Sequence, residues 1–144
     1  MEGTPEEKVK EEEIKEEKEI VKDKGEGLFK RGVDEFKKGK FEDAVALFRQ
    51  ATEVDAEKPQ YWSYLSLSLS KVPHKMKEAE DALLKAIKLE PLNGEHYVNL
   101  GSLYLKAGLH KSASGQFEKA LKFDPGNVNA QKGLKQAKES KVKS

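Results

Sequence analysis

The chain has 144 residues, which suits one domain of ordinary size, and no hydrophobic run approaches the about 18 residues that a membrane span needs. The absence of cysteine excludes disulfide bonds, a thiolate nucleophile and cysteine-ligated zinc. Charged residues make up 37% of the chain but nearly cancel, to a formal net charge of +1, which argues against a dedicated nucleic-acid-binding protein. The first residues lack the features of a secretory signal, so we expect a soluble, cytoplasmic protein.

The N-terminal segment is acidic and low in complexity. Residues 1–24 contain ten acidic residues and six lysines. The apolar residues between positions 6 and 24 are Val9, Ile14, Ile20 and Val21. Because these are too few to bury a helix face, we expect residues 1–24 to form a charged tail that is flexible or a frayed helix. Gly25 and Gly27 are expected to break this pattern.

Three segments that follow resemble one another at spacings of 34 and 35 residues, and we place the repeats at about 25–58, 59–93 and 94–127. Small residues recur at fixed places in the three repeats: Gly32, Ser66 and Gly101; Ala44, Ala79 and Ala113; Ala51, Ala86 and Ala120. Large residues recur between them: Leu28, Trp62 and Tyr97; Phe48, Leu83 and Phe117; Val54, Leu89 and Phe123. Small residues let two helices approach closely while large ones fill the remaining gaps, so each repeat is predicted to be a helix pair.

Turn signals divide each repeat into two helices. Gly39 and Gly108 lie at matching places between the predicted helices, and Pro91 and Pro125 follow the second helix of their repeats. Within a repeat, apolar residues fall three or four positions apart, as helices require, at Ala79, Leu83 and Ala86.

A final helix is predicted over residues 128–140, with a disordered tail at 141–144. Asn127 is the expected N-cap. A narrow apolar stripe on this otherwise lysine-rich segment consists of Ala130, Leu134 and Ala137. A stacked array must cover its last apolar face, so this element is predicted to be a capping helix.

These residues resemble the tetratricopeptide repeat family. The third repeat has nearly the whole pattern: Tyr97, Leu100, Gly101, Tyr104, Gly108, Ala113, Phe117, Ala120 and Pro125. The second has Ser66 for glycine and an extra residue around 72–74, so its inter-helix turn is expected to be irregular, and the first departs from the pattern at Arg31, Glu35 and Ala56. The resemblance covers about 25–138 and implies an all-α domain at 25–140, a right-handed superhelical array of antiparallel helix pairs.

Catalytic chemistry is not indicated. His74, His96 and His110 have no second ligand type at helix spacing, and we interpret them as surface histidines. There is no nucleophile elbow and no glycine-rich phosphate loop, so we predict no enzyme, no catalytic residue, no cofactor and no metal. Trp62 and its neighbouring tyrosines would suit base stacking, but Trp62 occupies the column that packs between helices, and no nucleic-acid partner is expected.

In this family the first helix of each pair lines a concave groove that receives a peptide or helix of a partner. The resemblance places twelve residues on that groove: Phe29, Val33, Phe36, Lys37, Ser63, Leu67, Lys71, Val98, Asn99, Ser102, Leu105 and Lys106. Lys37, Lys71 and Lys106 would form a basic stripe beside a mainly apolar floor, suited to an acidic segment. The alternative is that Phe36 and Leu105 pack between helices and that the lysines are ordinary solvated charges.

Chaperone-tail binders of the family hold a terminal carboxylate with a lysine and asparagine clamp. The chain has Phe29 and Val33 at the clamp positions of the first repeat and Tyr64 in place of asparagine in the second, whereas Asn99 fits. We therefore predict no tight binding of chaperone C-terminal tails.

Three hypotheses about function follow from this interpretation. The first is a non-enzymatic adaptor, scaffold or co-chaperone-like module whose groove binds another protein or peptide with apolar anchors and acidic flanks. The alternative is a self-associating assembly protein, in which the acidic N-terminal tail meets the basic C-terminal helix; residues 119–144 contain seven lysines and two acidic residues. A third, minor hypothesis assigns the lysines of the last helix to nucleic acid or anionic lipid.

Overall fold

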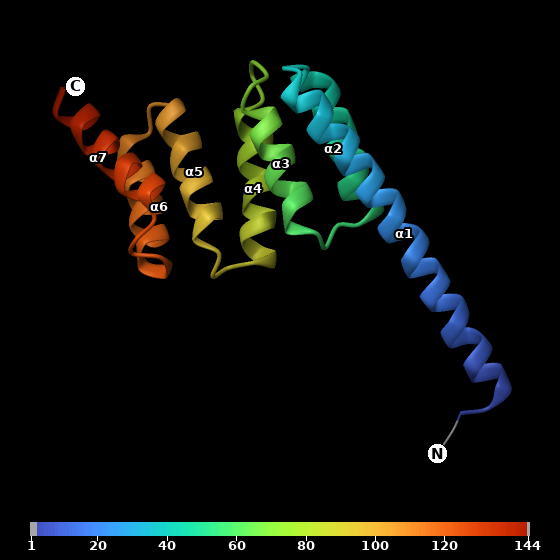
Figure 1. Cartoon of the computed structure of the whole chain (residues 1–144). Coiled ribbons are helices and arrows are strands. Elements are labelled where there is room, and N and C mark those ends of the chain that lie inside the picture. The colour runs from blue at the N-terminus through green and yellow to red at the C-terminus, as the bar shows by residue number, and fades with distance from the viewer. Residues whose placement is uncertain (1–2, 144) are drawn as a thin grey trace.

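The computed structural model describes residues 3–143, and this part of the chain forms seven α-helices and no strand. Consecutive helices pack as pairs, and the pairs stack in one row with α7 at the end (Figure 1). The helices are α1 (Pro5–Lys37), α2 (Phe41–Val54), α3 (Pro59–Leu69), α4 (Met76–Leu89), α5 (Gly94–Lys106), α6 (His110–Phe123) and α7 (Val128–Lys143). The predicted all-α array of helix pairs is confirmed. No helix among these residues is long and apolar enough to cross a membrane.

The columns of small residues lie where the paired helices touch. The six alanines of the two predicted alanine columns have no exposed surface. A Cβ at Gly32 would lie 2.5 Å from the Phe48 ring, and one at Gly101 would lie 2.7 Å from the Phe117 ring. The middle repeat has Leu83 in place of phenylalanine, and there Ser66 fits and donates a hydrogen bond of 2.7 Å from Oγ to the carbonyl of Ala79. Repeat spacing therefore predicted the helix contacts correctly.

The turns inside the three pairs all use left-handed backbone. Gly39 and Gly108 have φ angles of 78° and 79°, as expected for glycines in such turns. His74 takes the corresponding role in the second pair with a φ of 65°, a conformation that costs free energy for a residue with a Cβ. The turn between Leu69 and Met76 is longer than the turns of the other two pairs, in line with the extra residue around 72–74.

The helix α1 continues through the predicted break, so the expectation that Gly25 and Gly27 interrupt the pattern was wrong. Gly25 is buried, and a Cβ there would lie 3.1 Å from the Tyr61 hydroxyl, so its small size allows α1 to approach α3. The helix starts with a capping box: Glu7 N–H donates to Thr4 Oγ1 over 3.2 Å, and Thr4 N–H donates to Glu7 Oε2 over 3.0 Å. This start signal was present in the sequence. Residues 5–24 form a regular, exposed helix that projects from the array (Figure 1).

The last helix begins as predicted and ends later. Ala130 N–H donates to Asn127 Oδ1 over 2.9 Å, which confirms Asn127 as the cap. The helix runs to Lys143, past the predicted end near residue 140, and Ser144 lies outside the described residues. No glycine or proline follows Gly133, so nothing in the sequence terminates the helix.

Candidate functional site

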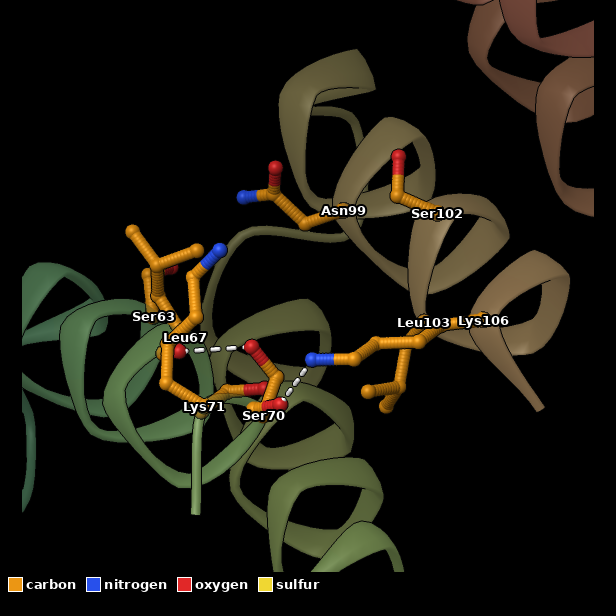
Figure 2. A pocket seen from close by; sticks show the side chains of 9 residues that line it. Ser63, Leu67, Ser70, Lys71, Asn99, Ser102, Leu103 and Lys106 are labelled. Carbon is orange, nitrogen blue, oxygen red and sulfur yellow. Dashed lines mark hydrogen bonds between the residues drawn. The ribbon is translucent and has the colours of Figure 1, made fainter. Parts of the chain in front are cut away.

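A pocket lies between α3 and α5 on the face formed by the first helices of the second and third pairs. It is lined by Ser63, Ser66, Leu67, Ser70, Lys71, Asn99, Ser102, Leu103 and Lys106 (Figure 2). Six of the twelve predicted groove residues meet here: Ser63, Leu67, Lys71, Asn99, Ser102 and Lys106. Helix geometry explains this convergence, because residues three, four or seven positions apart share a face of each helix.

The pocket combines hydroxyl groups, an amide and two amines around one exposed apolar side chain. Leu67 is 41% exposed. Lys106 reaches across from α5 and donates a hydrogen bond from Nζ to the backbone carbonyl of Ser70, as Figure 2 shows. Lys71 is exposed in the turn just after α3. This arrangement offers donors to an anionic group and a small apolar contact beside them.

The first repeat does not extend this pocket. Phe29 packs against Tyr61 and Tyr64, with ring centroids 5.2 Å and 5.0 Å away, and Phe36 lies 6.5 Å from Tyr64. Val33 is also partly buried against the same core. Lys37 is exposed but lies outside the pocket, so the pocket brings together two of the three lysines of the predicted stripe.

Two predicted groove residues on α5 are mainly packing residues. Val98 is buried in the core formed by α5, α6 and α7, and Leu105 is half-buried against the same core. The alternative in which Phe36 and Leu105 pack between helices therefore agrees with their surroundings.

His96 is not a surface residue, which corrects the prediction made for the three histidines. Its side chain is buried, with Nε2 2.8 Å from Glu90 Oε1 and Nδ1 3.1 Å from Ser63 Oγ. The hydrogen bond with His96 lowers the pKa of the Glu90 carboxyl below its ordinary value. His110 is half-buried and His74 is exposed. The repeat register was the sequence signal for the contact between Ser63 and His96. These residues lie near the starts of α3 and α5, the first helices of two neighbouring pairs.

The pattern of the tetratricopeptide repeat matches residues 29–69 and 75–128, which make up more than half of the chain. The chain belongs to the tetratricopeptide repeat family. One relative, the Hsp70-Hsp90 organizing protein of Triticum aestivum, is 30% identical over 110 residues, which cover 76% of this chain and 19% of the relative. The chain spans about a fifth to just over a quarter of the length of the curated relatives it matches.

Solved structures of tetratricopeptide domains share the fold. The first such domain of Spaghetti (RPAP3), bound to the HSP90 peptide SRMEEVD, has a TM-score of 0.77 and 20% identity, covering 83% of this chain and 94% of that one. MamA has a TM-score of 0.76 and 23% identity, covering 99% of this chain and 87% of its own. The likeness to MamA therefore includes the projecting part of α1 as well as the tetratricopeptide array.

A recurring hydrogen bond ties each of α3, α5 and α7 to the loop before it. Trp62 Nε1 donates to the carbonyl of Ala56 over 2.8 Å, and Tyr97 Oη donates to Pro91 over 2.6 Å. Gln131 in α7 donates to the carbonyl of Pro125 over 3.0 Å, again six residues back. The predicted packing role of Trp62 is confirmed. The capping helix thus repeats a contact made by the first helices of the second and third tetratricopeptide pairs.

Proposed function

We propose that this chain is a non-enzymatic protein-interaction module that binds a segment of a partner protein in the pocket between α3 and α5. The observation that carries the proposal is the convergence of Lys71, Lys106 and the exposed Leu67 in one hydroxyl-lined pocket. Membership of the tetratricopeptide repeat family supports it, as does the peptide bound to the structurally similar domain of Spaghetti.

The chemistry of the pocket favours a partner segment with acidic side chains beside a small apolar anchor. The two amines carry positive charge, and Asn99 and the serines offer additional donors. Leu67 provides the apolar contact. Affinity is expected to be modest, because a short segment loses conformational entropy when it binds.

Tight binding of chaperone C-terminal tails is not expected, although relatives and structural neighbours carry chaperone names. The positions that would supply lysine and asparagine in the first two repeats hold Phe29, Val33 and Tyr64. Phe29 and Tyr64 pack edge to face with ring centroids 5.0 Å apart, so their surfaces are committed to each other. Titration with SRMEEVD tests this: low-micromolar affinity that is lost in Asn99→Ala would contradict it.

The groove proposal is tested with an acetylated and amidated peptide of alternating leucine and glutamate. Proton-nitrogen NMR shifts are expected to cluster on Leu67, Asn99 and Ser102. Substitution Lys71→Gln should weaken binding, whereas Lys37→Gln is a matched control from the same repeat column outside the pocket. The proposal would be contradicted if the two substitutions changed the peptide affinity equally, or if the NMR shifts spread outside the pocket.

Self-association remains a second candidate, favoured by the exposed, acidic extension of α1 and the lysine-rich α7, which lie at opposite ends of the array (Figure 1). Val9, Ile14 and Ile20 on the extension are each about half exposed or more. The contact would be head to tail, and such contacts grow into open assemblies. Sedimentation of the full chain and of a variant lacking residues 1–24 separates the candidates. Assembly by the extension disappears with it, whereas peptide binding in the groove persists.

A further inference from the structure

Ser63 connects the pocket to a buried histidine. Its side chain lines the pocket, and its Oγ lies 3.1 Å from Nδ1 of His96. The opposite ring nitrogen, Nε2, lies 2.8 Å from Glu90 Oε1, and His96 is only 5% exposed. A relay of hydrogen bonds therefore runs from a carboxylate in the turn before α5, through the imidazole, to a hydroxyl in the pocket.

The protonation state of His96 determines which way this relay points. The ionised Glu90 accepts a hydrogen bond from Nε2–H of His96. In the neutral imidazole Nδ1 therefore has a lone pair and accepts a hydrogen bond from the Ser63 hydroxyl. Ser63 then presents only oxygen lone pairs to the pocket. In the imidazolium, Nδ1–H donates to Ser63 Oγ, and the hydroxyl proton becomes free to donate into the pocket.

We propose that protonation of His96 switches Ser63 from an acceptor to a donor in the pocket and thereby strengthens the binding of an acidic partner segment. This inference rests on the function proposed above. The added positive charge of the imidazolium acts in the same direction, because it lies behind a pocket that already contains two lysines. A histidine is suited to this role because its ordinary titration falls near neutral pH.

Other charged groups lie on the elements around His96. Glu90, in the turn before α5, is the charged side chain bonded to the imidazole among the described residues. Lys71 after α3 and Lys106 on α5 face the pocket. Glu95, beside His96 on α5, accepts a hydrogen bond of 2.5 Å from Asn127 and so faces the start of α7. From the second helices, Lys85 of α4 and Lys119 of α6 lie over the Trp62 and Tyr97 rings.

The direct test measures the affinity of the full chain for the alternating leucine and glutamate peptide at about pH 6 and about pH 8, where the glutamates of the peptide stay ionised. Wild type is expected to bind about five- to tenfold more tightly at the lower pH, close to the net contribution of one typical hydrogen bond. His96→Gln retains a neutral donor near Glu90 and should reduce the ratio of the affinity at pH 6 to the affinity at pH 8 to about one. Ser63→Ala retains the charge of His96 but removes the hydroxyl, and should reduce the ratio partly.

Three results would overturn the inference: a wild-type ratio near one, a ratio unchanged in His96→Gln, or a ratio unchanged in Ser63→Ala. Because the chain also contains His74 and His110, the His96→Gln comparison is the deciding one.

A measurement without peptide separates this inference from the groove proposal. Nitrogen NMR of the His96 ring gives its titration midpoint in the free protein, and the resonances of Ser63 and Asn99 are expected to shift with that same midpoint. A chain that binds no acidic peptide at either pH contradicts the proposed function. If the Ser63 resonances do not shift with the His96 midpoint, the hydrogen-bond relay is contradicted, whether or not the peptide binds.

Discussion

Gly133 of α7 lies against the ring of Phe117 in α6, so closely that a Cβ at position 133 would come within 2.4 Å of the ring. The same ring also meets Gly101 of α5, where a Cβ would approach to 2.7 Å. Phe117 is 1% exposed and has no room to retreat. The capping helix is therefore joined to the array by the same glycine and phenylalanine contact that closes the first and third helix pairs.

Substitution Gly133→Ala is expected to destabilise the protein by about 1 to 3 kcal/mol, because the added methyl group overpacks a buried ring. Urea unfolding followed by circular dichroism measures the change. Gly115→Ala is the matched control, since Gly115 lies inside α6 with nothing within 4 Å of its missing Cβ. Alanine there should stabilise the helix by up to about 1 kcal/mol. Equal effects at the two positions would contradict the close contact.

Substitution His74→Gly should stabilise the protein, by about 0.5 to 1 kcal/mol. His74 has a φ of 65°, and glycine adopts this left-handed conformation without the steric cost of a Cβ. Gly108→Ala is the converse variant and should destabilise by a similar amount. Thermal unfolding of both variants checks the pair, and a loss of stability in His74→Gly would show that the imidazole has a role that the turn geometry does not explain.

The stability of the array is expected to fall at high pH because of Tyr104. Burial, followed by a hydrogen bond to Glu80, raises the pKa of the Tyr104 hydroxyl from 10.0 to about 12. The folded state therefore favours the neutral phenol, and this contribution is complete below pH 10 and is lost as the pH rises from 10 towards about 12. Urea unfolding across this range measures the loss. Tyr104→Phe should flatten the dependence, and an unchanged slope in that variant would assign the loss to other groups.

Binding of an acidic segment should depend on salt through its association rate. Lys71 and Lys106 attract an anionic segment before contact, and ions screen that attraction over about 10 Å at 0.1 M ionic strength. Stopped-flow association of the alternating leucine and glutamate peptide should slow by about threefold or more from low to physiological ionic strength. The matched peptide with glutamine in place of glutamate should show little change, and equal salt dependence would contradict electrostatic attraction.

Periodic and local features were readable from the sequence alone. The alanine columns are buried as predicted because a residue repeated every 34 or 35 positions returns to the same place in a stack of helix pairs. Gly39, Gly108 and the Asn127 cap were also predicted correctly, since a turn or a cap depends on a few neighbouring residues. The start of α1 at Thr4 was equally local, although the prediction did not use it.

Contacts between different helices required the tertiary structure. In a sequence, a glycine can indicate either the end of a helix or a close approach between two helices. The position of Tyr61 shows that Gly25 allows α1 to approach α3 closely. Phe29 and Phe36 were placed on the groove by their column, but the ring of Tyr64 packs against both. The sequence by itself therefore determined the repeat, its turns and its buried columns, because these depend on period and neighbours. Tertiary structure decided which groove positions converge and that His96 is buried beneath Ser63, because those depend on how particular side chains fill the space between helices.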